Sequence, residues 1–287
     1  MRAIDLDQLR PKLHRYCSRM VGSVLDGEDV VQEALLRALE SPMPDRPIDN
    51  PEGWLFRIAH NLAIDLQRRR ARTDRMNGEE DVESIEDPLD AQARHDAAAA
   101  TLPVFMKMPA TQRSVVILFD VLDYSAQEIS EIVDTTVPAV KSTLQRGRER
   151  LRTLSETSMG RQEIETLSEA EHGLLRRYVD LFNARDFDAL REILAADVRL
   201  DLVNRRALQG SAVGEYFGRY GQRNDWFAFS GVVEGRPAVL MRQFDRPDGE
   251  PDYFVVLGVS DGRIATIRDF LFARYVMKNA NYSRLRE

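Results

Sequence analysis

Apolar residues recur at helical spacing through much of the chain, and the pattern changes at several points. Residues 1–73 and 104–154 carry apolar positions three and four residues apart, which predicts amphipathic helices. Between them, 74–103 has few large apolar groups and indicates a solvated acidic linker with a helix-permissive end. A short junction at 155–166 then leads into 167–287, where a different pattern begins.

The last part of the chain combines helical spacing with period-two alternation. Two helices, a strand and a further helix are expected first, followed by strands at about 226–233, 238–244, 253–260 and 263–273. The pair Asp261-Gly262 between the last two strands is typical of a tight β-hairpin. We therefore predict a multidomain chain with two all-α domains followed by an α+β domain, in which helices cover a curved, mostly antiparallel sheet.

Composition narrows the class of protein. The chain has 287 residues, 43% of them hydrophobic, which is enough to build folded domains and excludes general disorder. A single cysteine, Cys17, cannot form an intramolecular disulfide, and four scattered histidines offer no metal-binding cluster. No run of residues approaches a membrane span, and the charged N-terminus lacks the apolar core of a signal peptide. We expect a cytoplasmic protein with no membrane segment, metal or other cofactor.

Residues 126–154 have the layout of a helix-turn-helix. A short amphipathic helix over 126–133 is followed by a tight turn and a longer helix over 137–154. From residue 135 to 152 there are five basic residues and one acid, Glu149. The residues expected to reach bases or phosphates are Thr135, Thr136, Lys141, Ser142, Arg146 and Arg148. The alternative is an ordinary solvated helix whose arginines pair with nearby carboxylates.

A second helix with a polar stripe is expected after Pro51. Its apolar face faces the core, and Arg57, Asn61, Asp65, Arg68 and Arg72 recur on the other side. Amide groups can read an unstacked base and guanidinium groups can hold phosphates, so this stripe suits single-stranded DNA. We favour function for the asparagine and arginines. For Asp65, and for Trp54 at the start of the helix, we favour a structural role.

An acidic patch is predicted on the helix before this one. In GEDVVQEALLRALE, residues 27–40, the side chains of Asp29, Gln32 and Glu33 share one helix face, while Val30 and Leu35 are turned to the opposite side. A plain exposed acidic face is the alternative, because such faces are common.

Together these motifs resemble a known family. Three segments are similar to extracytoplasmic-function (group 4) sigma factors. They are the D-x-x-Q-E motif of Asp29, Gln32 and Glu33, the W-L-x-x-I-A-x-N motif around Asn61, and the sequence from Pro109 to Ser142. The resemblance covers about residues 5–154. It implies that the first three residues bind the β′ clamp of core RNA polymerase, with β as a further contact. It also implies that the Asn61 helix holds the minus-ten strand and that the helix-turn-helix reads minus-thirty-five promoter DNA. Thr143 stands where the family often has arginine.

Residues 167–287 resemble the SnoaL-like, ketosteroid-isomerase-like fold. The resemblance places Tyr178 at the family's donor tyrosine but puts Leu202 at the position of the catalytic base, with Asp201 on the opposite face of its strand. We therefore predict no catalytic residues. A small-molecule ligand is a candidate for the interior. The aromatic residues considered as pocket lining or plain core are Phe227, Phe229, Phe254, Phe270 and Phe272.

The resemblance implies a sigma factor, not an enzyme, that directs promoter recognition and whose activity the C-terminal domain modulates in cis. Two alternatives stay open: a one-component regulator with a ligand-sensing pocket, and a SnoaL-like isomerase or hydrolase fused to a regulatory module. The net charge of −7 does not argue against DNA binding. Residues 74–103 carry nine acids and two bases, and so account for the whole acidic excess.

Overall fold

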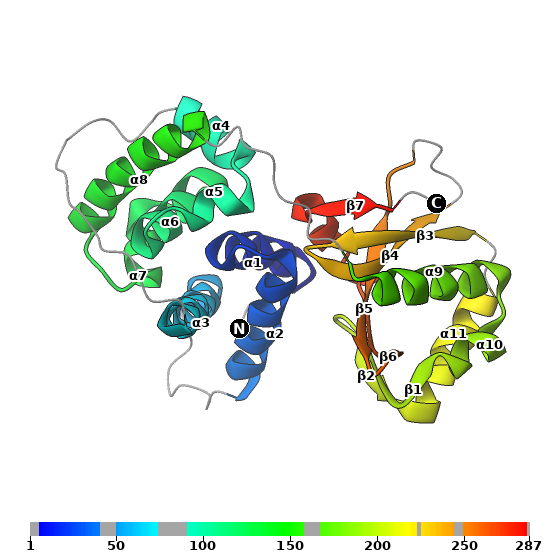
Figure 1. The fold of residues 1–287 in the computed structure, drawn as a ribbon. Helices are drawn as coiled ribbons and strands as arrows, with labels where there is room; N and C mark the ends of the chain where they lie inside the picture. Colours follow the sequence, from blue (N-terminus) through cyan, green and yellow to red (C-terminus); the bar gives the residue numbers. More distant parts are fainter. Residues whose placement is uncertain are drawn as a thin grey trace. The chain divides into compact units, whose positions relative to one another are not determined.

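The computed structural model describes residues 6–40, 50–73, 91–157, 167–222, 225–243 and 249–285. The chain folds into two compact units, Met1–Arg161 and Gln162–Glu287 (Figure 1). The division falls within the segment predicted as a junction. Within the described residues, no helix is long and apolar enough to cross a membrane.

Three long helices open the first unit. They are α1 (Leu6–Val21), α2 (Val24–Glu40) and α3 (Pro51–Thr73), as the helical spacing predicts. Gly22, with φ of 79°, allows the sharp turn between α1 and α2. The side chain of Asn50 accepts a hydrogen bond from the backbone N–H of Gly53 at 2.9 Å and so caps the start of α3.

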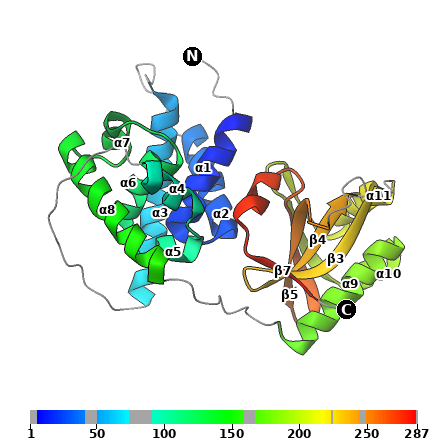
Figure 2. The ribbon, with the colours of Figure 1, turned by 90° about the horizontal axis from the view of Figure 1, so that it is seen from above.

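The rest of the first unit contains shorter helices and the helix-turn-helix. The elements are α4 (Ala91–Ala99), α5 (Leu102–Met106), α6 (Ala110–Val116), the π-helical segment η1 (Ile117–Val121), α7 (Ala126–Ile132) and α8 (Val137–Thr157). Ser125 and Glu128 form a reciprocal capping box at the start of α7. The helix α4 lies within the stretch interpreted as a linker and packs on η1 and α8 (Figure 2).

A single hydrophobic core joins α1–α3 to α5–α8. Arg113 in α6 is buried and donates to the backbone carbonyl of Met20 in α1. The phenol of Tyr124 donates to the carboxylate of Glu52 in α3, and Lys12 Nζ lies 2.6 Å from the same carboxylate. The Phe56 and Tyr124 rings meet edge to face with centroids 5.1 Å apart. The two helical modules are therefore packed against each other within this unit.

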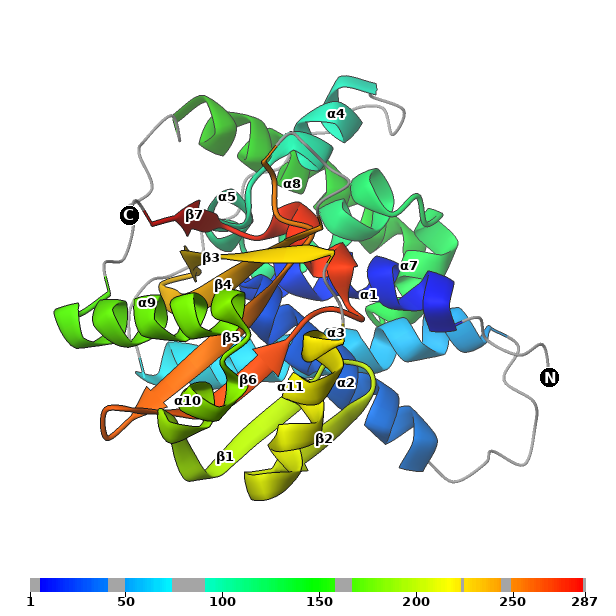
Figure 3. The same cartoon turned by 90° about the vertical axis from the view of Figure 1, so that its right-hand side faces the viewer.

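The second unit is an α+β domain, as predicted. Its helices α9 (Glu169–Ala184), α10 (Phe187–Glu192) and α11 (Gly214–Gly221) cover one face of a seven-stranded sheet (Figure 3). The strands are β1 (Leu194–Leu202), β2 (Arg206–Gln209), β3 (Trp226–Val233), β4 (Arg236–Gln243), β5 (Tyr253–Ser260), β6 (Arg263–Asp269) and β7 (Tyr282–Arg284). Short 3-10 turns, η2 (Gly210–Val213) and η3 (Arg274–Asn279), complete the unit.

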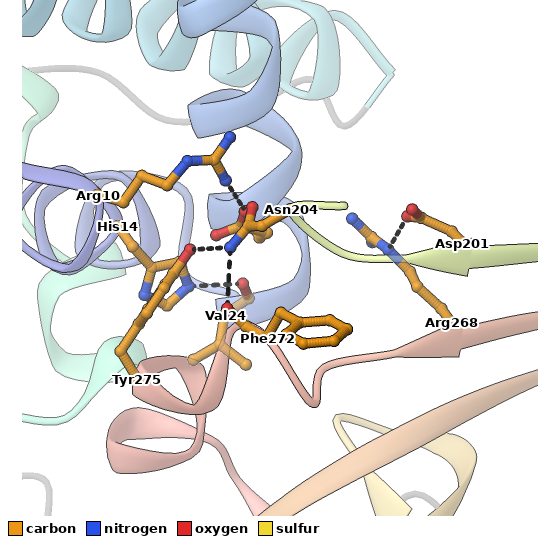
Figure 4. Close-up of polar contacts among 9 residues, drawn as sticks. Arg10, His14, Val24, Asp201, Asn204, Arg268, Phe272 and Tyr275 are labelled. Atoms are coloured by element: carbon orange, nitrogen blue, oxygen red, sulfur yellow. Dashed lines mark hydrogen bonds and ion pairs between the residues drawn. The ribbon is translucent and has the colours of Figure 1, made fainter. Parts of the chain in front are cut away.

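The strand order is β2-β1-β6-β5-β4-β3-β7, and every pair is antiparallel except β1 with β6. Asp261 and Gly262 both have positive φ, 51° and 71°, as the hairpin between β5 and β6 requires. Asp201 pairs with Arg268 on the neighbouring strand at 3.3 Å (Figure 4). The side-chain amide of Asn204 donates to the Tyr275 hydroxyl at 3.0 Å and so ties the β1–β2 turn to η3.

Candidate polymerase and DNA interface

The acidic patch lies on α2. Asp29 and Glu33 are exposed and Gln32 is half-buried, while Val30, Val31, Ala34 and Leu35 face the core. Glu33 pairs with Arg37 one turn later at 2.8 Å. Leu36 and Leu39 are 53% and 82% exposed on the same helix, so apolar area adjoins the acidic residues.

The base of this helix is fixed by buried polar contacts. His14 in α1 donates from Nε2 to the Val24 carbonyl at 2.9 Å, and Arg10 lies 3.4 Å from the buried carboxylate of Glu28 (Figure 4). Burial lowers the pKa of His14 to about 4, so the ring is neutral at pH 7. These contacts hold α1 and α2 in register beneath the acidic face.

The polar stripe lies on α3 and is presented outward. Arg57, Asn61 and Arg68 are exposed, while Leu55, Ala59 and Leu62 are buried on the other face. Arg57 Nη2 lies 3.4 Å from a carboxylate oxygen of Asp134, in the turn of the helix-turn-helix. The side chain of Arg72 lies outside the described residues.

Trp54 and Asp65, the two residues of this helix for which a structural role was predicted, differ in their burial and contacts. Trp54 is half-buried, so only part of its ring belongs to the core. Asp65 is exposed, and its backbone carbonyl accepts a hydrogen bond from Arg69 Nε at 3.3 Å. The neighbouring His60 is supported from α1, where the Tyr16 hydroxyl lies 2.7 Å from Nδ1.

The predicted recognition helix is α8. Thr135, Thr136, Lys141 and Ser142 are all exposed at the turn and the first turns of the helix. The Thr136 hydroxyl accepts from the backbone N–H of Ala139 at 3.3 Å, which caps the helix. Asp134, with φ of 58°, makes the left-handed bend that separates α7 from α8. The polar surface at this end of α8 therefore comes from the preceding turn and from the second turn of the helix, because the first turn, residues 137–140, is apolar.

Arg148 is not part of this surface. Its guanidinium is buried and makes a two-point ion pair with Asp120 of η1, at 3.0 Å and 2.5 Å. It also lies over the Phe119 ring. We therefore remove Arg148 from the predicted DNA-binding set, because a buried, paired side chain cannot reach a phosphate. Arg146 is half-buried, at the edge of the exposed face.

In the second unit, strand alternation places Leu202 inside and Asp201 on the other face, as predicted. The inner hydrophobic cluster contains none of the five phenylalanines considered as pocket lining or core, but two of them, Phe227 and Phe229, line a cavity of about 450 Å³ bounded by α9, β3 and β7. Phe227 and Phe272 are exposed, Phe229 is half-buried, and Phe254 and Phe270 pack on each other outside this cluster. The reason is the period of two: Trp226, Ala228, Tyr253 and Val255 occupy the inner face, so their chain neighbours point away.

A buried carboxyl that the sequence analysis missed lies inside this unit. Asp269 on β6 is directly paired in register with Leu202 on β1 and is fully buried. Its carboxylate accepts hydrogen bonds from the hydroxyls of Tyr216 at 3.0 Å and Tyr220 at 2.8 Å, and from the backbone N–H of Leu271 at 2.8 Å. Alternation from the buried Ile267 could have located it, because residues 267 and 269 share a face.

Comparison with known proteins identifies the family of the first unit. Residues 6–73 match the family described as Sigma-70 region 2, and residues 104–151 match Sigma-70, region 4. SigG, an ECF RNA polymerase sigma factor of Mycobacterium tuberculosis, is 32% identical over 213 residues, which cover 66% of this chain and 57% of SigG. The chain thus matches somewhat more than half of that relative's length.

Two further proteins are similar to this chain. A crystal structure of the Mycobacterium tuberculosis extracytoplasmic function sigma factor SigJ aligns with 92% of this chain and 94% of its own, at 22% identity. Its TM-score of 0.35 is too low to establish a shared overall fold. SigW of Bacillus subtilis, an ECF RNA polymerase sigma factor, is 31% identical over 163 residues, which cover 51% of this chain and 84% of SigW. The chain therefore belongs to the extracytoplasmic-function family of RNA polymerase sigma factors.

Proposed function

We propose that this protein directs promoter recognition and transcription initiation by bacterial RNA polymerase. The observation that carries the proposal is the pair of outward polar faces on α3 and α8, each within a segment that matches a sigma-70 region. Asp29, Gln32 and Glu33, with the exposed Leu36 and Leu39 beside them, would contact the β′ clamp of core polymerase.

The DNA contacts are divided between the two modules. Residues 1–73 would engage the minus-ten strand through Arg57, Asn61, Arg68 and Arg72. Residues 104–154 would engage minus-thirty-five duplex through the α8 face. Thr135, Thr136, Lys141 and Ser142 supply that face, with Arg146 at its edge. No step requires chemistry by the protein, because exposed bases and phosphates provide the binding free energy for strand opening. We place this activity in the cytoplasm, with core polymerase and promoter DNA as partners.

A substitution of Asn61 tests the minus-ten assignment. In run-off transcription with core polymerase, we expect Asn61→Ala to lose open complex, detected as permanganate-reactive thymines, while core binding stays intact. Gln92→Ala, an exposed change on α4, is the matched control. Full open-complex formation by Asn61→Ala, or failure of the wild-type chain to bind core polymerase, would contradict the proposal. The second result would favour a one-component DNA-binding regulator.

We further propose that the C-terminal unit, residues 167–287, modulates this activity in cis and that its interior receives a small molecule. Support comes from its separate hydrophobic core and from the buried polar groups within it. The test compares promoter output of the full chain with that of residues 1–161. Equal output at equal core occupancy would contradict modulation in cis.

A further inference from the structure

A cavity of about 450 Å³ lies on the second unit, between α9, β3 and the end of β7. It is separate from the interior of the curved sheet. On α9, Tyr178 and Phe182 belong to the inner hydrophobic cluster, whereas Arg176, Asp180 and Asn183 line the cavity. The cavity therefore adjoins a different face of α9 from the one that packs on the inner cluster. Its volume lies within the range of small-molecule sites.

The cavity forms where β7 ends. The strand β7 pairs with β3 at residues 231–233, and the backbone N–H of Leu285 donates to the Ser230 carbonyl at 2.9 Å. Beyond this point the side chain of Asn183 takes the place of a strand. Its amide donates to the Ala228 carbonyl at 2.9 Å, and its oxygen accepts from the Ala228 N–H at 3.0 Å. The edge of β3 is thus closed to an added peptide strand at Ala228, and the hollow beside it suits a compact molecule.

One wall of the cavity is aromatic and carries guanidinium groups. The rings of Phe227 and Phe229 have centroids 4.9 Å apart, and Phe227 is 36% exposed. The guanidinium carbon of Arg284 lies 3.8 Å from the centroid of Phe229, and that of Arg242, on the neighbouring strand, lies 5.1 Å from the same centroid. A guanidinium stacked on a ring keeps its N–H groups available in its own plane. The wall therefore offers an apolar surface on Phe227 beside hydrogen-bond donors on Arg284.

The charged lining of the cavity is mainly basic. Arg176 and Arg284 are exposed, and Asp180 lies one turn after Arg176 on α9. Among the residues that the structure describes, none of these three side chains forms an ion pair with another part of the chain. Two guanidinium groups against one carboxylate make the lining positive, whatever the charge of the neighbouring His172. Guanidinium groups bind carboxylates and phosphates through paired hydrogen bonds, so this lining favours an oxyanion.

We propose that this cavity binds a small aromatic oxyanion, with Arg176 and Arg284 holding its carboxylate or phosphate group and Phe227 stacking on its planar body. The site is outside the interior for which a ligand was proposed above and does not rest on that proposal. A cationic ligand would be repelled by the two guanidinium groups. A neutral ligand would gain the stacking on Phe227 but not the charge-assisted hydrogen bonds.

Three probes of the same ring test the proposal on the full-length chain. Isothermal titration calorimetry at low salt compares 2-naphthoate, 2-naphthyl phosphate and 2-naphthamide, the neutral isostere of the carboxylate. We expect saturable binding of at least one anion, with 2-naphthamide bound roughly tenfold more weakly or less. Affinity for the anion should fall as salt is added, whereas that for 2-naphthamide should not. The ratio between the two anions shows whether the site prefers a carboxylate or a phosphate.

Single substitutions place the anion within the cavity. Arg176→Gln should weaken binding of the preferred anion roughly three- to tenfold and leave 2-naphthamide unchanged. Arg177→Gln is the matched control, because Arg177 is the exposed neighbour of Arg176 on α9 but does not line the cavity. Asp180→Asn should tighten anion binding roughly two- to fivefold, since it removes the opposing charge. A general loss of folding cannot produce that gain.

Three results would overturn the proposal. One is the absence of saturable binding of either anion up to its solubility limit, and another is equal affinity for 2-naphthoate, 2-naphthyl phosphate and 2-naphthamide. The third is an equal loss of anion affinity in Arg176→Gln and Arg177→Gln, which would assign the binding to the general charge of the surface. The comparison of probes needs only the wild-type chain, so it decides the matter even where a variant does not fold.

Discussion

At the scale of single residues, Arg148 illustrates what a charge pattern leaves undetermined. A basic residue on a predicted recognition helix can face DNA or can face the core, and the choice depends on a carboxylate 28 residues away, Asp120. The residues next to Arg148 in the sequence do not indicate that pairing. Asn61, Lys141 and Ser142 were placed on exposed faces because the apolar residues around them define the buried side unambiguously.

The ion pair leads to a stability prediction. Asp120→Ala removes the carboxylate that forms a two-point ion pair with the buried Arg148 guanidinium, so we expect the first unit to lose about 3 kcal/mol or more of unfolding free energy. Urea unfolding followed by Trp54 fluorescence measures this loss. The double variant Asp120→Leu with Arg148→Met should recover most of it, because apolar side chains replace both charges. A loss below about 1 kcal/mol, the value of an exposed pair, would show that the pair is not effectively buried.

At the scale of elements, helices and strands were predicted well where one face is apolar. The helix-turn-helix, β3 and β5 begin and end within a few residues of their expected positions. The three-residue strand β7 and the four-residue β2 were missed, because so short a segment carries no readable alternation. The parallel pairing of β1 with β6 is a long-range contact that no turn residue encodes.

Two helices, one in each unit, begin with the same capping motif. Ser125 with Glu128 at α7, and Ser168 with Glu171 at α9, form reciprocal capping boxes on the surface. We expect each serine-to-alanine change to cost about 1 kcal/mol of unfolding free energy in its own unit and to leave the other unit unchanged. Trp54 reports on the first unit and Trp226 on the second, so each variant is the control for the other. A shift in both transitions would mean that the units unfold together.

At the scale of the whole molecule, the two units should respond to pH in opposite directions. In the first, burial lowers the pKa of His14 and His60 to about 4, so both histidines take up protons on unfolding. Their contribution to the unfolding free energy of the first unit is complete above about pH 6.5 and is lost as the pH falls toward 4. In the second unit, burial raises the pKa of Asp269 to about 6. The contribution of Asp269 to the unfolding free energy is therefore complete below about pH 4 and is lost as the pH rises through 6.

Between pH 7 and pH 5 we therefore expect the first unit to become less stable and the second more stable. Urea unfolding of Trp226→Phe, which keeps Trp54, follows the first unit, and Trp54→Phe follows the second. Asp269→Asn should remove the pH response of the second unit, whereas His95→Gln, at an exposed histidine, should leave both responses unchanged. Glu52 and Glu171, whose pKa values are lowered, titrate below this window and do not disturb it. A loss of stability in both units on acidification would contradict this prediction. It would mean that Asp269 stays ionised throughout, because the hydrogen bonds from Tyr216 and Tyr220 stabilise the carboxylate enough to offset the effect of burial on its pKa.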